Sequence, residues 1–257
     1  MESSEKLFRL DGRRALITGS TQGIGLALAY GLAGAGATVV LNGRDAERVA
    51  AAAEKMRADG CAAECAAFDV TQQAAVAEAI DRVERDCGPI DILINNAGIQ
   101  RRAPLEDFPG EHWEAILANN VSSVFYVSQA VARYMIPRGR GKIINICSVQ
   151  SQLGRPTIAP YTASKGAVAN LTKGMCADWA KYGIQANGLA PGYFATEMNK
   201  ALVENEDFSA WLCKRTPAGR WGRVEELNGA AIFLAADASS FVNGQIIYVD
   251  GGMTSCV

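Results

Sequence analysis

The sequence predicts an α/β fold, in which a doubly wound parallel sheet of seven strands is covered by helices on both faces. Two observations indicate this fold. Short runs rich in β-branched residues alternate along the chain with longer alanine-rich stretches, whose apolar residues recur at helical spacing. A glycine-rich turn also follows the first of these short runs. Because parallel strands must be joined by long crossover connections, usually helices, strand–helix alternation predicts a parallel sheet.

Seven runs are expected to be strands, because each is short, apolar and bounded by turn-forming residues. They are 14–18, 37–42, 61–69, 90–95, 141–147, 184–190 and 245–250. Six stretches between them show helical periodicity, namely 23–36, 45–60, 71–88, 111–136, 161–183 and 223–237. The segment 191–222 interrupts this alternation. Since long excursions at the carboxyl end of a strand are often functional, we interpret 191–222 as a substrate lid.

The composition is that of an ordinary globular protein. The chain has 257 residues, which suits a single domain spanning 1–257, with 49% hydrophobic residues, 20% charged residues and a net charge of −2. This charge is not basic enough for a nucleic-acid surface, and we find no signal peptide and no apolar run that would span a bilayer. The seven cysteines have irregular spacings, and His112 is the sole histidine. We therefore expect a cytoplasmic protein with no metal, nucleic-acid or membrane partner.

The glycine-rich turn after the first predicted strand has chemistry suited to phosphate. In "TGSTQGIG", Gly19, Gly23 and Gly25 follow the spacing G-x-x-x-G-x-G and open a helix. Glycines allow the backbone to approach a pyrophosphate, and the helix N-terminus supplies free N–H groups and a partial positive charge. Two more tight turns, "NNAG" after the fourth strand and "PG" at 191–192, follow other strands. Together these turns predict a Rossmann-type dinucleotide site.

The end of the second predicted strand indicates which dinucleotide is bound. An acidic residue there would accept hydrogen bonds from a ribose 2′-OH and repel a 2′-phosphate. The sequence reads "LNGRD" instead, with Asn42 at the expected carboxylate position and Arg44 close behind it. This combination favours NADP(H) over NAD(H), although Arg44 could instead be a solvated residue at a helix start. Asp45 is interpreted as the N-cap of the following helix.

The sequence "YTASK" predicts acid–base chemistry. Tyr161 and Lys165 are four residues apart on a predicted helix, so their side chains lie on one face. A nearby ammonium stabilises a phenolate and lowers the tyrosine pKa, which starts near ~10. Such a phenol can protonate a carbonyl oxygen during hydride transfer. Ser148, at the end of the fifth strand, could hydrogen-bond the same oxygen.

With these blocks in place, the chain resembles the short-chain dehydrogenase/reductase family over essentially its whole length. "TGSTQGIG", "NNAG", "YTASK" and "APGYFAT" occur in the family's order. The resemblance implies a catalytic tetrad of Asn120, Ser148, Tyr161 and Lys165, with Asn119 as the neighbouring alternative to Asn120. In this tetrad, Tyr161 is the acid/base, Ser148 positions the reacting oxygen, and Lys165 holds the nicotinamide ribose. Asn120 would support a water molecule that links the lysine to solvent.

The family pattern also implies further contacts to the cofactor. Asp69 and Val70 are expected at the adenine, and Asn96, Ala97 and Gly98 at the ribose. The full expected set is completed by Ser20, Thr21, Gln22, Ile24, Pro191, Gly192, Phe194 and Thr196, together with Tyr161 and Lys165. Members of the family are typically tetramers or dimers, so a homo-oligomer is expected.

The segments that the tetrad does not use bear on the substrate. "GIQRR", "CSVQSQLGRPTIAPY" and 191–222 are polar and carry arginines, unlike the apolar channel that a steroid or long acyl chain would need. A guanidinium held away from Tyr161 could bind a carboxylate, so we expect a sugar acid. Of the adjacent pair Arg101 and Arg102, we choose Arg102, because neighbouring side chains in an extended segment point opposite ways.

Further residues are also assigned to the substrate side. Ser148 and Tyr161 would contact the reacting group, while Gln150, Ser151 and Tyr193 are candidates for sugar hydroxyls. Trp211 and Arg215 belong to the predicted lid, although a core position is the alternative for Trp211.

Three other functions stay open at this point. A reductase of 3-oxoacyl thioesters would need an apolar tunnel and a basic surface for its carrier protein, and the polar 191–222 segment argues against it. Other sugar-acid or polyol dehydrogenases use the same tetrad and are compatible with the sequence. A non-catalytic nucleotide-sensing or scaffold protein is disfavoured, because such relatives usually lose the tyrosine or lysine that this chain keeps.

Overall fold

A computed structural model describes residues 4–196 and 199–256 of the chain. Its centre is one sheet of seven parallel strands, as the alternation predicts, and the strand order is β3-β2-β1-β4-β5-β6-β7. The strands are β1 (Arg14–Ile17), β2 (Thr38–Gly43), β3 (Ala63–Ala67), β4 (Ile92–Asn95), β5 (Gly141–Ile146), β6 (Ile184–Pro191) and β7 (Ile246–Val249). β3 is shorter than the expected 61–69. The strand order reverses between β1 and β4, which is where folds of this kind bind ligands.

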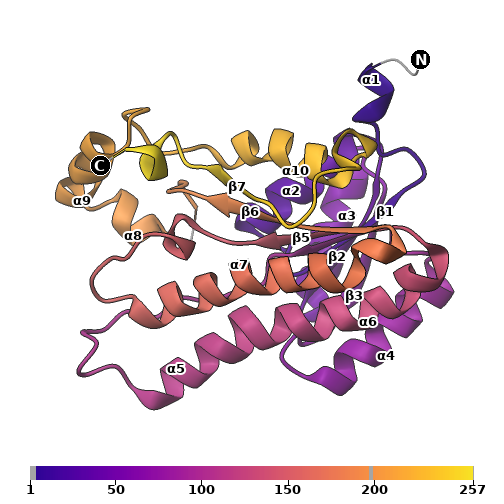
Figure 1. Cartoon of the computed structure of the whole chain (residues 1–257), viewed down its shortest axis with the longest axis horizontal. Coiled ribbons are helices and arrows are strands. Elements are labelled where there is room, and N and C mark those ends of the chain that lie inside the picture. Colours follow the sequence, from indigo (N-terminus) through magenta and orange to yellow (C-terminus); the bar gives the residue numbers. More distant parts are fainter. Residues whose placement is uncertain (1–3, 197–198, 257) are drawn as a thin grey trace.

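Helices cover both faces of the sheet (Figure 1). One face carries α2 (Gly23–Gly34), α3 (Ala46–Ala58) and α10 (Asn228–Ala235), and the other carries α4 (Gln73–Asp86), α6 (Ser123–Arg138) and α7 (Ala159–Trp179). Consecutive side chains of a strand point to opposite faces of the sheet. Ile17 packs against the first set of helices, and Leu16 packs against the second. Because both faces are covered, β4 and β5 are buried throughout and are mostly apolar.

The predicted helix 111–136 is divided into two helices. α5 (Gly110–Leu117) and α6 are separated by a π-helical turn at Ala118–Ser122. Polar side chains there bond to the helix backbone, since Asn119 Nδ2 donates to Ala115 O at 2.9 Å and Ser123 Oγ donates to Asn119 O at 2.6 Å. Side chains of this kind compete with the regular helical ladder, and π-turns are frequent at functional sites.

The predicted lid segment 191–222 lies at the end of the sheet, beside the C-terminal segment (Figure 1). It contains α8 (Lys200–Val203) and α9 (Glu206–Arg215), and the Asn205 side chain caps α9 by accepting a hydrogen bond from Phe208 N at 2.8 Å. Glu197 and Met198, which also belong to the predicted lid, lie outside the described residues. Leu212 fixes α9 to a small apolar cluster with Val149 and Met253. Trp211 is 47% exposed, so its alternative assignment to the core is wrong.

The remaining elements are short. They are α1 (Ser4–Leu7) and the 3-10 turns Val149–Ser151, Ala180–Tyr182, Val224–Leu227, Asp237–Ser239 and Met253–Ser255. Within the described ranges, no helix combines the length and apolar character that crossing a membrane requires.

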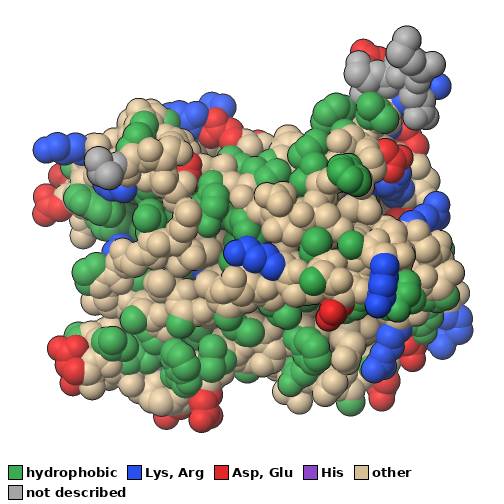
Figure 2. Space-filling view, viewed as in Figure 1, with side chains coloured by type: hydrophobic (Ala, Val, Ile, Leu, Met, Phe, Trp, Pro, Cys, Tyr) green, Lys and Arg blue, Asp and Glu red, His purple; other side chains and the backbone are tan. Residues whose placement is uncertain are grey.

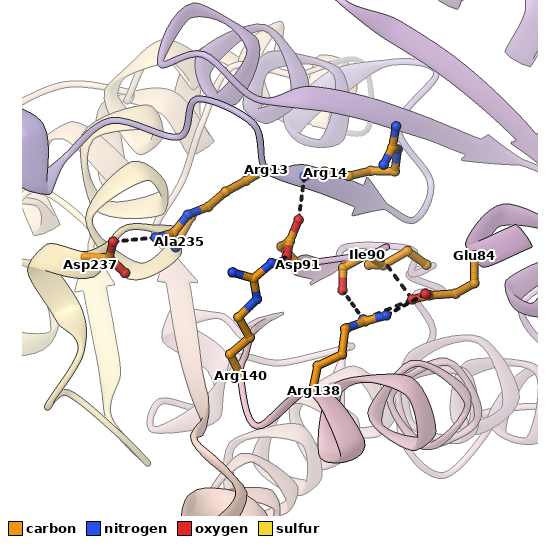
Figure 3. A network of polar contacts seen from close by, with 9 residues as sticks. All are labelled: Arg13, Arg14, Glu84, Ile90, Asp91, Arg138, Arg140, Ala235 and Asp237. Carbon is orange, nitrogen blue, oxygen red and sulfur yellow. Dashed lines mark hydrogen bonds and ion pairs between the residues drawn. The ribbon is translucent and has the colours of Figure 1, made fainter. Parts of the chain in front are cut away.

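Ionic side chains gather at the amino ends of the strands, opposite the predicted site (Figure 3). Arg138 pairs with Glu84, and Arg140 pairs with Asp91, whose other oxygen accepts a hydrogen bond from Arg14 N at 3.1 Å. These contacts connect α4 and α6 to the edges of the central strands. The network is therefore a structural support for the end of the sheet away from the site.

The outer surface over α5 and the start of α6 is apolar, in contrast to the ionic network at the amino ends of the strands. Hydrophobic side chains gather there, at the lower left of Figure 2. Trp113 in α5 is 41% exposed and Phe125 in α6 is 42% exposed. Large apolar side chains that share one surface often mark a contact with another protein.

Candidate active site

The turns after β1 and β4 are locked together. Gly19 has φ +61°, and a Cβ at this residue would lie 2.9 Å from Ala97 Cα. At Gly25, a Cβ would lie 2.5 Å from Asn96 Nδ2. Asn96 Nδ2 donates to the carbonyl oxygens of Thr18 and Gly19, both at 2.9 Å. The glycines are therefore required for contact between the two turns as well as for access of a ligand.

A cavity of about 380 Å³ opens along these turns at the carboxyl ends of the strands. It ends at α2, whose N-cap residue Gln22 makes no side-chain capping hydrogen bond within the described structure. The first N–H groups of α2 are thus available to an anion. The predicted residues that line the cavity are Gly19, Thr21, Gln22, Gly23, Ile24, Gly25, Asn42, Arg44, Val70, Asn96, Ala97, Gly98, Tyr161, Lys165 and Thr196.

Five residues predicted to bind cofactor are not part of the cavity lining as described. Ser20 is fully buried and donates to Ile17 O at 2.7 Å, so it shapes the turn from beneath. The Asp69 carboxylate holds Thr71 N at 2.9 Å ahead of α4. Phe194 is buried, and its ring packs against Gly222. The other two are Pro191 and Gly192.

Asn42 lines the cavity, but its side chain has a different task from the one expected. Its Oδ1 accepts from Gly19 N at 3.2 Å, and its Nδ2 donates to Ala66 O and Phe68 O at 3.1 and 3.2 Å. The residue is 1% exposed. Asn42 therefore holds the glycine turn onto β2 and β3, and both Nδ2 hydrogens are used within the protein.

Two arginines stand at the same rim of the cavity. Arg44 is exposed, as expected of a residue that meets a ligand from solvent. Arg48, which sequence reasoning missed, also lines the cavity and donates from Nη2 to Gln22 Oε1 at 2.7 Å. Asp45 caps α3 as predicted, by accepting from Glu47 N and Arg48 N at 3.0 and 3.1 Å. This cap places Arg48 in the first turn of the helix, a position that could have drawn attention to it.

The donor set fits a dinucleotide with an additional phosphate. A helix N-terminus with available N–H groups and a glycine turn suit a pyrophosphate. Two guanidinium groups at the far rim suit a ribose phosphate, because arginine binds phosphate with two parallel hydrogen bonds.

Tyr161 and Lys165 both line this cavity, and Ser148 lies beside Tyr161. Lys165 Nζ donates to Ile146 O at 2.7 Å and lies 5.7 Å from the centre of the Tyr161 ring. Ser148 follows β5 and caps the 3-10 turn Val149–Ser151, accepting from Gln150 N at 3.1 Å. Ser151 Oγ in turn donates to Lys165 O at 2.9 Å, so Ser151 supports α7 rather than facing a substrate.

Burial determines how Tyr161 and Lys165 titrate. Burial of its hydroxyl raises the pKa of Tyr161 to about 12, and a hydrogen bond with Ser148 opposes this only in part. Burial lowers the pKa of Lys165 to about 8. Contrary to the expected lowering by Lys165, the pKa of Tyr161 is raised, because desolvation is the largest influence on it and Lys165 is not among the groups that oppose it. At neutral pH the phenol keeps its proton and can donate it.

Asn120 lies beneath the site. It is 1% exposed, and its Oδ1 accepts from Ile99 N at 2.8 Å while Nδ2 donates to Ile99 O at 3.0 Å. Nδ2 also donates to Ser164 Oγ at 3.1 Å, which links the turn after β4 to α7. The neighbouring Asn119 lines the cavity instead.

Two of the expected substrate residues, Arg102 and Tyr161, lie near a third, Tyr193. The pKa of Tyr193 is raised by burial and lowered by Arg155 and Arg102, with a smaller effect of Tyr161. Gln150 is 6% exposed, and its Oε1 has no hydrogen-bond partner in the described part of the chain. Arg101 is exposed and donates to Gln100 O at 3.4 Å.

Two further arginines, Arg155 and Arg215, lie near the segment 191–222 or within it. Arg155 was missed as an individual residue, although its segment is one of those that bear on the substrate. Arg215 donates to Cys256 O at 3.0 Å, so it fastens α9 to the C-terminal segment.

Known proteins provide a comparison for this geometry. A family described as enoyl-(acyl carrier protein) reductase matches residues 19–254. Gluconate 5-dehydrogenase of Gluconobacter oxydans (strain 621H) is 65% identical over 252 residues, covering 98% of each chain. 5-Keto-D-gluconate 5-reductase of Escherichia coli (strain K12) is 57% identical over 251 residues, which cover 98% of this chain and 99% of that protein. A gluconate 5-dehydrogenase structure from Burkholderia cenocepacia J2315, in complex with NADP and tartrate, has a TM-score of 0.98 and 66% identity, covering 99% of this chain and all of that one.

Proposed function

Because this chain belongs to the short-chain dehydrogenase/reductase family, we propose that it interconverts 5-keto-D-gluconate and D-gluconate with NADP(H). The position of Tyr161 carries this proposal. On one side Tyr161 lines the dinucleotide cavity with Lys165. On the other side its hydroxyl forms a hydrogen bond with Ser148. Tyr161 also affects the pKa of Tyr193, which interacts with Arg155 and Arg102. Acid–base chemistry, cofactor and a site for an anionic substrate thus meet at one phenol.

The reaction is a reduction by hydride and proton transfer. NADPH supplies the hydride to the carbonyl carbon at C5 when it is bound. Ser148 orients the carbonyl oxygen, and the Tyr161 phenol gives its proton to that oxygen, so that the ketone becomes an alcohol. In the reverse direction the phenolate accepts the alcohol proton. Lys165 stands beside the tyrosine, and Asn120 fixes the turn at Ile99 beneath both.

The preference for NADP(H) is assigned to the guanidinium groups at the cavity rim. Arg44 and Arg48 would hold the 2′-phosphate of the adenosine ribose. A charge-assisted hydrogen bond of this kind contributes roughly 1.5–3 kcal/mol. Asn42 contributes indirectly, because a neutral residue at the end of β2 leaves no carboxylate to repel the phosphate.

The substrate would lie between Tyr161 and the segment 191–222, which we assign as the lid of a single domain. Arg102 would bind the carboxylate, with Gln150 and Tyr193 at the sugar hydroxyls. A 3-oxoacyl thioester is a poorer fit, because arginines rather than an apolar tunnel stand beside Tyr193.

Substrate profiling tests this function directly. NADPH oxidation is measured against 5-keto-D-gluconate, other keto-acids, uncharged ketoses and an acetoacetyl thioester. The highest kcat/KM is expected with 5-keto-D-gluconate. A higher value with the thioester would replace the proposal with an acyl reductase, and no turnover of any substrate would favour a nucleotide-sensing protein.

We also assign the apolar surface over α5 and α6 to a homo-oligomer, either a tetramer or a dimer. Exposed Trp113 and Phe125 support this assignment. Light scattering coupled to size-exclusion chromatography measures the mass, and Phe125→Asp should lower it. A monomeric wild type would contradict the assignment.

A cytoplasmic location is part of the same proposal. Cys65 and Cys256 are exposed free thiols, which persist in a reducing compartment. Fractionation of the native host, followed by an activity assay of each fraction, tests the location.

A further inference from the structure

Arg155 is held against the aromatic side chains of the segment 191–222. Its guanidinium carbon lies 5.2 Å from the centre of the Phe208 ring and 6.0 Å from that of Tyr193. The same two rings pack on each other, with centroids 5.9 Å apart, and both contact Trp221. Stacking on aromatic faces stabilises a guanidinium and fixes its plane, so Arg155 has a defined orientation in this segment.

One polar atom of Arg155 has no partner in the described part of the protein. Its Nε is buried and has no hydrogen-bond partner among residues 4–196 and 199–256. No carboxylate in the same described ranges forms an ion pair with Arg155. A buried donor without a partner costs roughly 1–3 kcal/mol, and more when the group is charged. The Arg155 guanidinium, which has no counter-ion and whose Nε has no acceptor in the described residues, can therefore donate hydrogen bonds to a bound anion.

Arg102, a second arginine without a counter-ion, is exposed, and its segment is joined to that of Arg155 because Ala103 N donates to Thr157 O at 3.1 Å. Arg102 Nη2 donates to the neutral Gln100 Oε1 at 3.1 Å, and the described structure gives it no acidic partner. Burial lowers the pKa of Arg102, and the positive charge of Arg155 lowers it further. Two positive charges that repel each other favour the binding of an anion, because the anion relieves the repulsion.

We propose that Arg155 and Arg102 together bind the carboxylate of the substrate, with Arg155 oriented by Phe208 and Tyr193. This inference rests on the proposed function and adds to it a specificity-determining residue. Arg155, Arg102 and Tyr161 are all close enough to Tyr193 to affect its pKa, so the two arginines and the acid/base surround one tyrosine. A carboxylate has enough lone pairs to accept from both guanidinium groups.

The test compares Arg155→Gln with Arg101→Ala, a control that removes one positive charge from an exposed neighbour of Arg102. For Arg155→Gln we expect KM for 5-keto-D-gluconate to rise roughly 10- to 100-fold with little change in kcat. KM for an uncharged ketose should stay unchanged. Arg155→Lys keeps the charge but loses the planar fork, so it should fall between wild type and Arg155→Gln. Arg101→Ala should behave as wild type.

Binding of L-tartrate, a hydroxydicarboxylate, to the NADP⁺-loaded enzyme gives a second readout by calorimetry. Its affinity should fall in Arg155→Gln and in Arg102→Ala, while the affinity for NADP⁺ and the melting temperature stay at wild-type values. Unchanged KM and unchanged tartrate affinity in Arg155→Gln would overturn the inference, as would equal losses for charged and uncharged ketoses. If the wild type reduces no 5-keto-D-gluconate, the proposed function fails, and the tartrate titration still decides on the arginine pair.

Discussion

Lys165 Nζ lies 5.7 Å from the centre of the Tyr161 ring and donates its hydrogen bond to Ile146 O, not to the tyrosine. The two groups thus share one region of low polarity, in which each is driven toward its neutral form. The phenol, whose neutral form carries the proton, is ready to act as an acid.

Tyr161→Phe should remove this acid and leave the rest of the site in place. Because general acid catalysis typically contributes about 10²- to 10⁴-fold, we expect kcat for ketone reduction to fall by at least that factor. NADPH binding, followed by quenching of protein fluorescence, should be unchanged. Turnover retained within tenfold of wild type would show that another group supplies the proton.

Arg44→Ala should weaken the preference for NADP(H). The guanidinium interacts with a 2′-phosphate that NADH lacks, so kcat/KM should fall roughly 10- to 100-fold with NADPH and little with NADH. Steady-state kinetics with both cofactors measure the ratio. The exposed Lys173 on α7 offers a control, since Lys173→Ala removes a positive charge far along that helix from Tyr161. Equal losses with both cofactors in Arg44→Ala would contradict the assignment.

Arg102→Ala should discriminate between charged and uncharged substrates. We expect KM for 5-keto-D-gluconate to rise roughly 10- to 100-fold, because one charge-assisted contact to the carboxylate is lost. KM for an uncharged ketose should be nearly unaffected. The assay is the same NADPH oxidation, with Arg101→Ala as the matched control. A similar rise for both substrates would mean that Arg102 shapes the site without binding the carboxylate.

The parts of the fold that the sequence predicts correctly are those determined locally. β4 and β5 are buried along their whole length, so most of their side chains are apolar, and Asp45 caps its helix through N–H groups two and three residues away. The π-turn at Ala118–Ser122 could not be predicted in this way. Its Asn120 is held by Ile99, which only the folded chain brings to it.

The site shows the same division. Tyr161 and Lys165 are one helical turn apart, so their spacing alone indicates a shared face. Asn42 differs from expectation because its partners Ala66 and Phe68 belong to another strand and its end. Arg155 acquires its surroundings from Phe208, which is distant in the sequence. Periodicity and motif spacing contain no information about such tertiary contacts.

Lys142 predicts how stability depends on pH. Its Nζ donates to Ser239 Oγ at 3.1 Å, and burial lowers its pKa to about 8 from 10.5 in spite of Asp237. Between these values the unfolded lysine binds a proton that the folded one does not, so this group makes the free energy of unfolding rise with pH. For one proton the slope cannot exceed about 1.4 kcal/mol per pH unit.

Urea unfolding at pH 7, 8, 9 and 10 measures this effect as the difference between wild type and Lys142→Met. The difference should shift in favour of the wild type from about pH 8 upward, and Lys173→Met should show no such trend. A difference that stays flat from pH 7 to 10 would mean that Lys142 titrates as an exposed lysine does.

Arg138 should be the costliest residue to remove from the ionic network in Figure 3. It donates to both oxygens of Glu84, at 2.6 and 3.1 Å, and to Ile90 O at 2.8 Å. The Glu84 side chain is only 7% exposed. In Arg138→Leu the carboxylate would keep its hydrogen bond from Ile90 N at 3.0 Å but lose its counter-ion. Breaking a buried pair from one side typically costs 3–5 kcal/mol, so we expect a loss of about that size.

The neighbouring pair Arg85–Asp86 provides the control, because its side chains are 69% and 51% exposed. Arg85→Leu should cost less than about 1 kcal/mol, since exposed pairs contribute little. The double variant Glu84→Leu/Arg138→Leu should recover part of the stability that Arg138→Leu loses, because no unpaired charge is then left buried. Urea unfolding measures the free energy of unfolding of each variant. If Arg138→Leu and Arg85→Leu lose equal amounts, or if the double variant is less stable than Arg138→Leu, an unpaired Glu84 carboxylate is not the cause of the loss in Arg138→Leu.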